Sequence, residues 1–166
     1  DVIIQTPYVI CNGYMYDVLQ GISDHAKLQI VLNAVEKGSN PWGCTDYLNQ
    51  KKKILETGAD VYELMNDYPV HTKAVLINDR LSVVGSYNLD MRSTYLDTEL
   101  MLVIDSEKLS QQIHETESDY MEKSKEVLAN GQETEGAKYQ GKVLNRKKKL
   151  YYGVLRIIIR PLRQLL

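Results

Sequence analysis

The sequence HTKAVLINDRLSVVGSYNLDMRSTYLDTELMLVID, residues 71–105, decides the fold. It holds two short β-rich runs, AVLI and LSVVG, separated by Asn78, Asp79 and Arg80. A polar step between two such runs predicts the turn of a β-hairpin. A further apolar run ends the stretch and predicts one more strand, from Glu99 to Asp105.

Polar side chains stand at the ends of this predicted hairpin. Successive side chains of a strand point to opposite faces, so His71 and Lys73 are expected on one face and Ser86 and Asn88 on one face. The hairpin is expected to bring the two pairs together. A cation with neutral donors suits the nonbridging oxygens of a phosphodiester, and an imidazole can attack phosphorus. His71 is therefore the candidate nucleophile, and Glu99 is the acid available to orient its ring.

Strands and helices alternate in the sequence on either side of this stretch. Upstream, the hydrophobic spacing predicts strands over residues 2–10, 28–34 and 59–65, a helix over residues 13–26, and a helix that Asn40 caps and Gly58 ends. Downstream, Ser106, or Asp105 before it, is expected to cap a helix that runs from Glu107 to near Asn130 and Gly131. The order predicts an α/β fold with a central mixed β-sheet flanked by helices.

Length and charge divide the chain into a body and a tail. The 166 residues suit one domain with a polar linker, so we expect residues 1–130 to form the domain and residues 131–145 the linker. Nine basic residues and no acidic one follow position 137, and the other 11 basic residues face all 22 acidic ones, so the body carries a net charge of −11. This charge disfavours nucleic acid as the partner. Cys11 and Cys44 lack metal-ligand spacing, so neither a zinc site nor a disulfide framework is expected.

Residues 146–166 form a basic amphipathic tail. If they are helical, one side collects apolar residues at Tyr151, Val154, Leu155, Ile158, Leu162 and Leu165. Pro161 and three arginines interrupt the apolar length, which favours contact with a membrane surface over a membrane span. Docking on a part of the protein that lies outside this sequence, or on a partner, is the alternative. The chain begins at Asp1 without methionine, and we expect a further part upstream.

The joint spacing of these residues resembles the second His-Lys-Asp motif of the phospholipase D superfamily, H-x-K-x4-D-x6-G-S-x-N with a downstream glutamate. The matching residues are His71, Lys73, Gly85, Ser86, Asn88 and Glu99. The motif's aspartate position holds Asn78, with Asp79 one residue later. Because that aspartate is structural in the superfamily, the change is expected to affect packing more than chemistry, and a shifted turn would let Asp79 substitute in part. Nearly the whole chain, including TPY near the start and NPWGCTDYLNQKKKILETGADVYEL, resembles the C-terminal half of bacterial cardiolipin synthases.

The resemblance implies a role for each matching residue. His71 would form a covalent phosphatidyl-histidine, Glu99 would orient His71, and Lys73, Ser86 and Asn88 would bind the phosphate without a metal or another cofactor. A second copy of the motif, in another half or a homodimer partner, would supply the histidine that protonates the leaving group. For Tyr8, Asp90, Arg92 and Ser93, lining the site and local packing are equally open.

The function expected from this resemblance is phosphatidyl transfer between phospholipids, with phosphatidylglycerol as substrate. We expect a peripheral location at the cytoplasmic face of a bacterial membrane, or anchoring through an N-terminal part. Two alternatives stay open. One is a phospholipase D-type phosphodiesterase or nuclease that works as a homodimer. The other is a non-catalytic scaffold half, suggested by Asn78 and the single motif.

Overall fold

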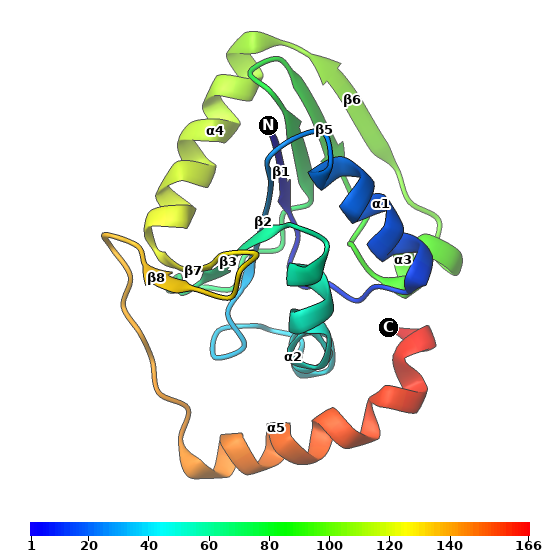
Figure 1. The fold of residues 1–166 in the computed structure, drawn as a ribbon, viewed down its shortest axis with the longest axis vertical. Helices are drawn as coiled ribbons and strands as arrows, with labels where there is room; N and C mark the ends of the chain where they lie inside the picture. The colour runs from blue at the N-terminus through cyan, green and yellow to red at the C-terminus, as the bar shows by residue number, and fades with distance from the viewer.

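The computed structural model describes residues 1–166 and contains one eight-stranded mixed sheet in the order β6-β5-β4-β1-β2-β3-β7-β8 (Figure 1). Its strands are β1 Val2–Gln5, β2 Leu28–Asn33, β3 Asp60–Leu64, β4 Ala74–Ile77, β5 Leu81–Gly85, β6 Met101–Asp105, β7 Ser124–Val127 and β8 Glu133–Glu135. Its helices are α1 Gly13–Ser23, α2 Pro41–Glu56, α3 Met91–Tyr95, α4 Glu107–Glu122 and α5 Arg146–Ile158, and a 3-10 helix η1 spans Arg160–Leu165. The predicted α/β class is confirmed.

The sheet combines parallel and antiparallel pairs. Strand β2 pairs in parallel with both β1 and β3, and a helical crossover connects each of these pairs. The β4-β5 pair is the predicted hairpin, with Ala74 opposite Val84 and Ile77 opposite Leu81. Strand β4 of this hairpin pairs antiparallel with β1, and β6 pairs antiparallel with β5 at the edge of the sheet. The segment with His71 and Lys73 and the segment with Ser86 and Asn88 therefore meet at one end of the hairpin.

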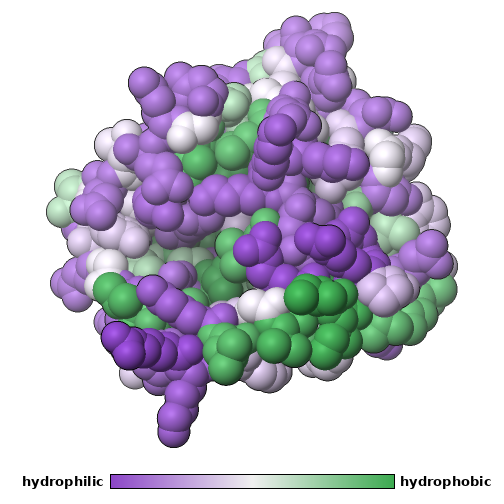
Figure 2. Space-filling model, turned by 60° about the horizontal axis from the view of Figure 1, so that its bottom comes forward, coloured by the Kyte–Doolittle hydropathy of each residue, from purple (hydrophilic) through white to green (hydrophobic).

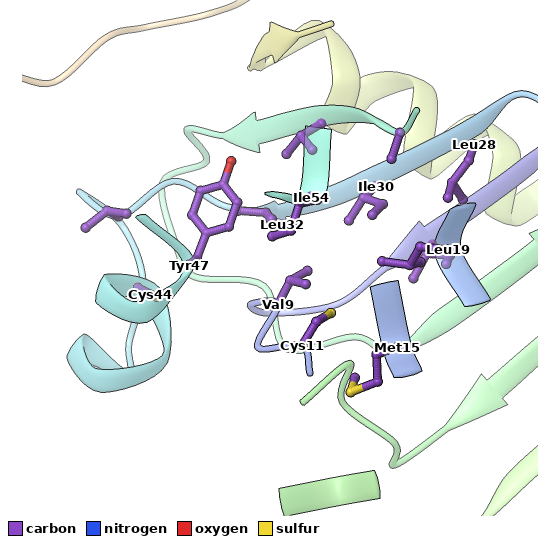
Figure 3. Close-up of a cluster of buried hydrophobic side chains, with 14 of the residues drawn as sticks. Val9, Cys11, Met15, Leu19, Leu28, Ile30, Leu32, Cys44, Tyr47 and Ile54 are labelled. Carbon is purple, nitrogen blue, oxygen red and sulfur yellow. The ribbon is translucent and has the colours of Figure 1, made fainter. Parts of the chain in front are cut away.

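Helices cover both faces of the sheet. On one face α1 and α2 pack against a cluster of 15 buried side chains, among them Met15, Leu19, Ile30 and Tyr47, and Figure 3 shows these side chains between the helices and the strands. On the other face α4 packs against a second cluster that includes Val31. Ile30 and Val31 are both fully buried although they point to opposite faces, which explains the continuous apolar run of β2.

Side-chain caps set the ends of the helices as the sequence predicts. Asn12 accepts a hydrogen bond from the Met15 amide, and Asn40 accepts hydrogen bonds from the amides of the first turn of α2, where Pro41 needs no partner. Gly58 ends that helix with φ +87°, a conformation that L-residues with a Cβ rarely adopt. Local chemistry therefore fixes where α2 begins and ends.

The first strand is shorter than predicted. The expected strand over residues 2–10 ends at Gln5, although the Thr6 amide still donates to the Val31 carbonyl and the Pro7 carbonyl still accepts from the Asn33 amide. Val9 pairs instead with Leu89 in an isolated bridge. The chain after β1 is thereby drawn toward the segment that follows the hairpin.

The predicted helix from Glu107 to Asn130 is wrong at its C-terminal end. The helix stops at Glu122, and Ser124–Val127 forms β7 against β3. The backbone groups at the edge of β3 need partners, and the buried Ser124 and Val127 supply a strand there. Gly131, with φ +84°, lies in the turn between β7 and β8 and does not end the helix. Strand β8 lies within the expected linker, residues 131–145, and the division of the chain into three parts stays a prediction.

The tail is helical, but its buried side differs from the predicted one. Tyr152, Leu155 and Ile159 are buried as α5 packs along α2. Tyr151, Val154 and Ile158, which were expected on the same side as Leu155, are about half exposed. Docking on α2 therefore decides which stripe is covered. None of the helices has the length and hydropathy needed to span a bilayer.

Glu117 of α4 is a buried carboxyl group at the interface between the helix and the sheet. Its side chain is 1% exposed, and neither oxygen has a hydrogen-bond partner. Burial raises the pKa of Glu117 to about 7. The folded state therefore favours the protonated acid, so stability is full below about pH 4.3 and falls as the pH rises through 7.

We expect Glu117→Gln to remove this loss of stability, because the amide stays neutral at every pH. At pH 8.5 the variant should exceed the parent in free energy of unfolding by roughly 1–3 kcal/mol. Urea unfolding at pH 5 and pH 8.5 measures the difference. Glu115→Gln, at an exposed position on the same helix, serves as the control and should keep the parent's pH dependence. A parallel pH dependence in the parent and in Glu117→Gln would contradict the prediction.

Candidate active site

The turn of the β4-β5 hairpin holds the motif position at which the sequence departs from the resemblance. Asn78 adopts φ 51°, in the left-handed region, which asparagine tolerates better than most residues. It lies at the opposite end of β4 from Lys73. Asp79 is almost fully exposed, and its carboxylate lies 3.7 Å from the His114 ring. Position 78 therefore shapes the turn, and the Asp79 carboxylate lies exposed at the tip of the hairpin.

The sequence predicted that His71 and Lys73 lie on a strand. In the structure both residues precede β4, which begins at Ala74. The backbone continues the pairing, since the Gly85 amide donates to the Lys73 carbonyl at 3.2 Å. Lys73 is buried, and its Nζ donates to His71 Nδ1 at 2.5 Å and to the His71 carbonyl at 2.8 Å. The structure thus places His71 and Lys73 in contact with each other.

The charge on this pair follows from its surroundings. Partial burial and the neighbouring ammonium of Lys73 lower the pKa of His71. Burial also lowers the pKa of Lys73, against the opposing field of Glu99 and Asp90. The His71 imidazole is therefore neutral at pH 7, as a nucleophilic nitrogen requires.

Ser86 and Glu99 join the ends of the two outer strands. The Ser86 hydroxyl donates to the Glu99 carboxylate, and the Ser86 amide donates to the Leu100 carbonyl at 3.0 Å. Glu99 itself precedes β6, two residues before the strand begins. The Glu99 carboxylate thus accepts a hydrogen bond from Ser86, and the structure shows none from the His71 ring to Glu99. The serine of the site is thus held by a carboxylate, and the histidine by a lysine.

Gly85 lies where the outer strands come closest. A Cβ at this position would lie 2.0 Å from the Leu100 carbonyl oxygen and 2.9 Å from the Met101 Cα. Both atoms belong to the backbone, which has no flexible side chain to move away. The glycine of the motif therefore permits the approach that places Ser86 beside Glu99.

Asn88 and Asp90 follow on the segment that leads into α3. Asn88 Nδ2 donates to the Ser93 hydroxyl at 3.3 Å, while its Oδ1 is buried without a partner. Asp90 accepts a hydrogen bond from the Ser93 amide at 2.6 Å and caps α3. Burial raises the pKa of Asp90. Burial and the field of Asp90 likewise raise the pKa of Tyr8, which shows that Tyr8 and Asp90 lie in one electrostatic neighbourhood.

Two further parts of the chain line this region, and the sequence did not predict that they would. Asn40, the cap of α2, and the C-terminal residues Leu165 and Leu166 line a pocket together with Asn88 and Asp90. No local pattern links these positions, because more than 120 residues separate Asn40 from Leu165 in the sequence. Only the docking of the tail brings them to the site.

Comparison with known proteins gives one family and several relatives. Residues 1–119 match the family model described as "Cardiolipin synthase, PLD-like domain". Cardiolipin synthase A of Proteus mirabilis is 30% identical over 151 residues, which is 88% of this chain and 29% of that protein. Cardiolipin synthase A of Serratia proteamaculans is 29% identical over 149 residues, 87% of this chain and 29% of that protein. The chain therefore spans less than a third of the length of these relatives.

Two solved structures share the fold. A phosphatidylserine synthase of Haemophilus influenzae superposes with a TM-score of 0.66 at 15% identity, over 99% of this chain and 41% of that one. Nuc, a phospholipase D family member of Salmonella typhimurium, superposes with a TM-score of 0.62 at 16% identity, over 75% of this chain and 80% of that one. At these identities the likeness concerns the fold.

Proposed function

The chain belongs to the cardiolipin synthase family of phospholipase D-like domains, and we propose that it supplies one half of an active site for phosphatidyl transfer between phospholipids. One observation carries the proposal: a neutral His71 bonded to a buried Lys73 lies at the end of the hairpin where Ser86 and Glu99 meet. The family relationship supports transferase or phosphodiesterase chemistry. The specific reaction and the roles of the residues are our proposal.

His71 is the nucleophile of the proposed reaction. An imidazole nitrogen forms a bond to phosphorus, the bond to the leaving alcohol breaks, and the departing oxygen takes up a proton. In the second step the hydroxyl of phosphatidylglycerol attacks the phosphohistidine, loses its proton and releases His71 with cardiolipin as product. Each step exchanges one bond at phosphorus for another.

Lys73, Ser86 and Asn88 bind the nonbridging oxygens in this proposal. In the structure the Lys73 ammonium donates to His71 Nδ1, which leaves the other ring nitrogen with the proton. A bound phosphate draws the ammonium to its own oxygens and frees the ring. Glu99 would then orient His71, a role that stays a prediction because Ser86 is its partner in the structure.

A second histidine is needed to protonate the leaving group, and we propose that another phospholipase D-like half supplies it. The edge strand β6 offers a surface for that half. Its apolar strip, defined as Leu100 just before the strand and Leu102 within it, has exposures of 72% and 57% beside Glu99. The outer edge of β6 is unpaired in the sheet order, and relatives more than three times as long have room for such a half.

We expect Leu102→Glu to lower transfer activity at least about tenfold, because a charge buried in the apolar strip opposes docking of the second half. The melting temperature should change little, since Leu102 is exposed in this half. Transfer assays and thermal unfolding on the complete protein measure both effects. Val143→Glu, at an 86% exposed position, is the matched control. Full activity in Leu102→Glu would show that the apolar strip is not part of the interface.

The tail gives the proposed contact with the membrane. The side of α5 turned away from α2 exposes Tyr151, Val154, Ile157 and Ile158, and Figure 2 shows a continuous apolar band along this part of the molecule with hydrophilic side chains beside it. The helix begins with four consecutive basic residues, each worth about 1 kcal/mol near an anionic leaflet. A peripheral position at the cytoplasmic face of a bacterial membrane is the location we propose.

The product formed from phosphatidylglycerol vesicles tests the proposed function. The complete protein should convert labelled phosphatidylglycerol to cardiolipin with release of glycerol. Cleavage of plasmid or single-stranded DNA in place of this reaction would favour a nuclease, which the −11 charge of the body disfavours. Inactivity on both substrates in the folded protein would favour a scaffold.

A further inference from the structure

Two separate segments supply the proposed phosphate site, and both attach to residues 6–8, the Thr-Pro-Tyr stretch that follows β1. The first arm, residues 70–73, holds the proposed nucleophile. The second arm, residues 88–89, holds the proposed amide ligand of the phosphate. One buried side chain attaches each arm to the stretch: Asn33 attaches the first arm, and Thr6 attaches the second.

Asn33, the last residue of β2, joins the first arm to the Thr-Pro-Tyr stretch. Its Nδ2 donates to the Pro7 carbonyl at 3.1 Å and to the Val70 carbonyl at 2.8 Å. Its Oδ1 accepts a hydrogen bond from the Val70 amide at 2.8 Å. Val70 directly precedes His71. The Asn33 side chain therefore holds the backbone from which the proposed nucleophile extends.

Thr6 joins the second arm to the same stretch. Its hydroxyl accepts a hydrogen bond from the Leu89 amide at 3.2 Å and donates to the Tyr8 carbonyl at 3.1 Å. The Ile10 amide adds a bond to the Leu89 carbonyl at 2.9 Å. Leu89 directly follows Asn88, so Thr6 holds the backbone of the second arm as Asn33 holds that of the first.

Both side chains act through the backbone. Asn33 and Thr6 are each 3% exposed, and all of their side-chain hydrogen bonds go to backbone groups. Loss of either side chain would leave buried backbone groups without partners, which the arm relieves by moving. A shift of about 1 Å at a reacting group costs on the order of 100-fold in rate, so the separation of the arms matters to the chemistry.

We infer that Asn33 and Thr6 are positioning residues, which set the separation between His71 and Asn88 by attaching both arms to residues 6–8. The inference rests on the proposed function, because it concerns the site where these two side chains would meet one phosphate. It gives the Thr-Pro-Tyr stretch a role in the site that needs no contact with the substrate.

Binding of inorganic phosphate to the complete protein, followed by calorimetric titration, tests the separation without turnover. Asn33→Ala and Thr6→Val should each weaken this binding at least about fivefold, because a phosphate can no longer bond to both arms at once. Thr6→Val keeps the shape of the side chain, so the test does not depend on how well Asn33→Ala folds. Thr6→Ser keeps the hydroxyl and should bind phosphate as the parent does.

Two matched controls remove similar groups away from the site. Gln29 lies on the same strand and the same face as Asn33, and it donates to the Tyr62 hydroxyl at 2.9 Å. The buried Thr57 hydroxyl donates to the Ile54 carbonyl at the end of α2 at 2.6 Å. Gln29→Ala and Thr57→Val should lower the melting temperature and keep the parent's affinity for phosphate. Equal effects of the variants and their controls on this affinity would reduce both residues to a structural role.

Transfer from phosphatidylglycerol separates this inference from the proposed function. Asn33→Ala should lower kcat/KM at least about tenfold. Weaker phosphate binding in Asn33→Ala and Thr6→Val, with no transfer by the parent, would refute the proposed function and leave the inference standing. Transfer by the parent, with unchanged phosphate affinity in both variants, would overturn the inference alone. A parent that binds no phosphate would overturn it as well.

Discussion

His71→Ala is expected to reduce phosphatidyl transfer at least about 1000-fold, because the variant has no nitrogen at this position to form a bond to phosphorus. The neighbouring Lys73, Ser86 and Asn88 remain, so lipid binding should persist. Single-turnover transfer from labelled phosphatidylglycerol, with acid quenching to look for a phosphohistidine adduct, measures both the rate and the intermediate.

The variant should fold as well as the parent, since the His71 side chain is exposed and its contacts are confined to Lys73. Unchanged thermal unfolding would show that the lost rate is chemical. His25→Ala is the matched control, because His25 is exposed just after α1 and its side chain hydrogen-bonds only to the Gly21 carbonyl. Unchanged transfer in His71→Ala would refute the assigned nucleophile.

Gly85→Ala is expected to give the largest loss of stability among single methyl additions in this chain. The added Cβ would meet the Leu100 carbonyl oxygen and the Met101 Cα at distances well inside van der Waals contact. Relief requires β5 and β6 to separate, at a cost of roughly 2–4 kcal/mol. A melting temperature lower by about 5–15 °C is expected for a chain of this size.

The same separation should reduce transfer, because Ser86 directly follows β5 and Glu99 lies just before β6. Moving the two strands apart would separate these two side chains of the site. Gly21→Ala provides the control, since it lies in α1 with no atom within 4 Å of the added Cβ. It should raise the free energy of unfolding by about 0.5–1 kcal/mol. A Gly85→Ala variant as stable as the parent would show that the outer strands are not held by this contact.

Local chemistry made much of the fold predictable. Asn40 with Pro41 determines the start of α2, and Gly58 determines its end. The β-rich run of residues 28–34 predicted a strand, which the structure has as β2. The turn at Asn78 to Arg80 predicted the hairpin. In each case neighbouring residues decide the backbone conformation, so a short window of sequence carries the information.

The errors arose where distant segments compete for the same residues. Ser124–Val127 extends the helical pattern of α4, yet the unpaired edge of β3 recruits it as a strand. On α5 the apolar residues surround the helix broadly, and packing on α2 selects Tyr152, Leu155 and Ile159 for burial. A pattern in one segment cannot show which face a partner from another segment will cover.

For the candidate site, the sequence by itself determined the residue types and their spacing, from His71 and Lys73 to Ser86, Asn88 and Glu99, because they all lie in one stretch of the chain, residues 71–99. The tertiary structure alone decided the hydrogen-bond partners: Lys73 donates to His71, and Ser86 donates to Glu99. It alone placed Leu165 and Leu166 beside Asn88, through the buried Asp46–Arg163 pair. The physical reason is range: spacing along a hairpin is local, whereas a buried ion pair between residues 117 positions apart forms only when the whole chain has packed.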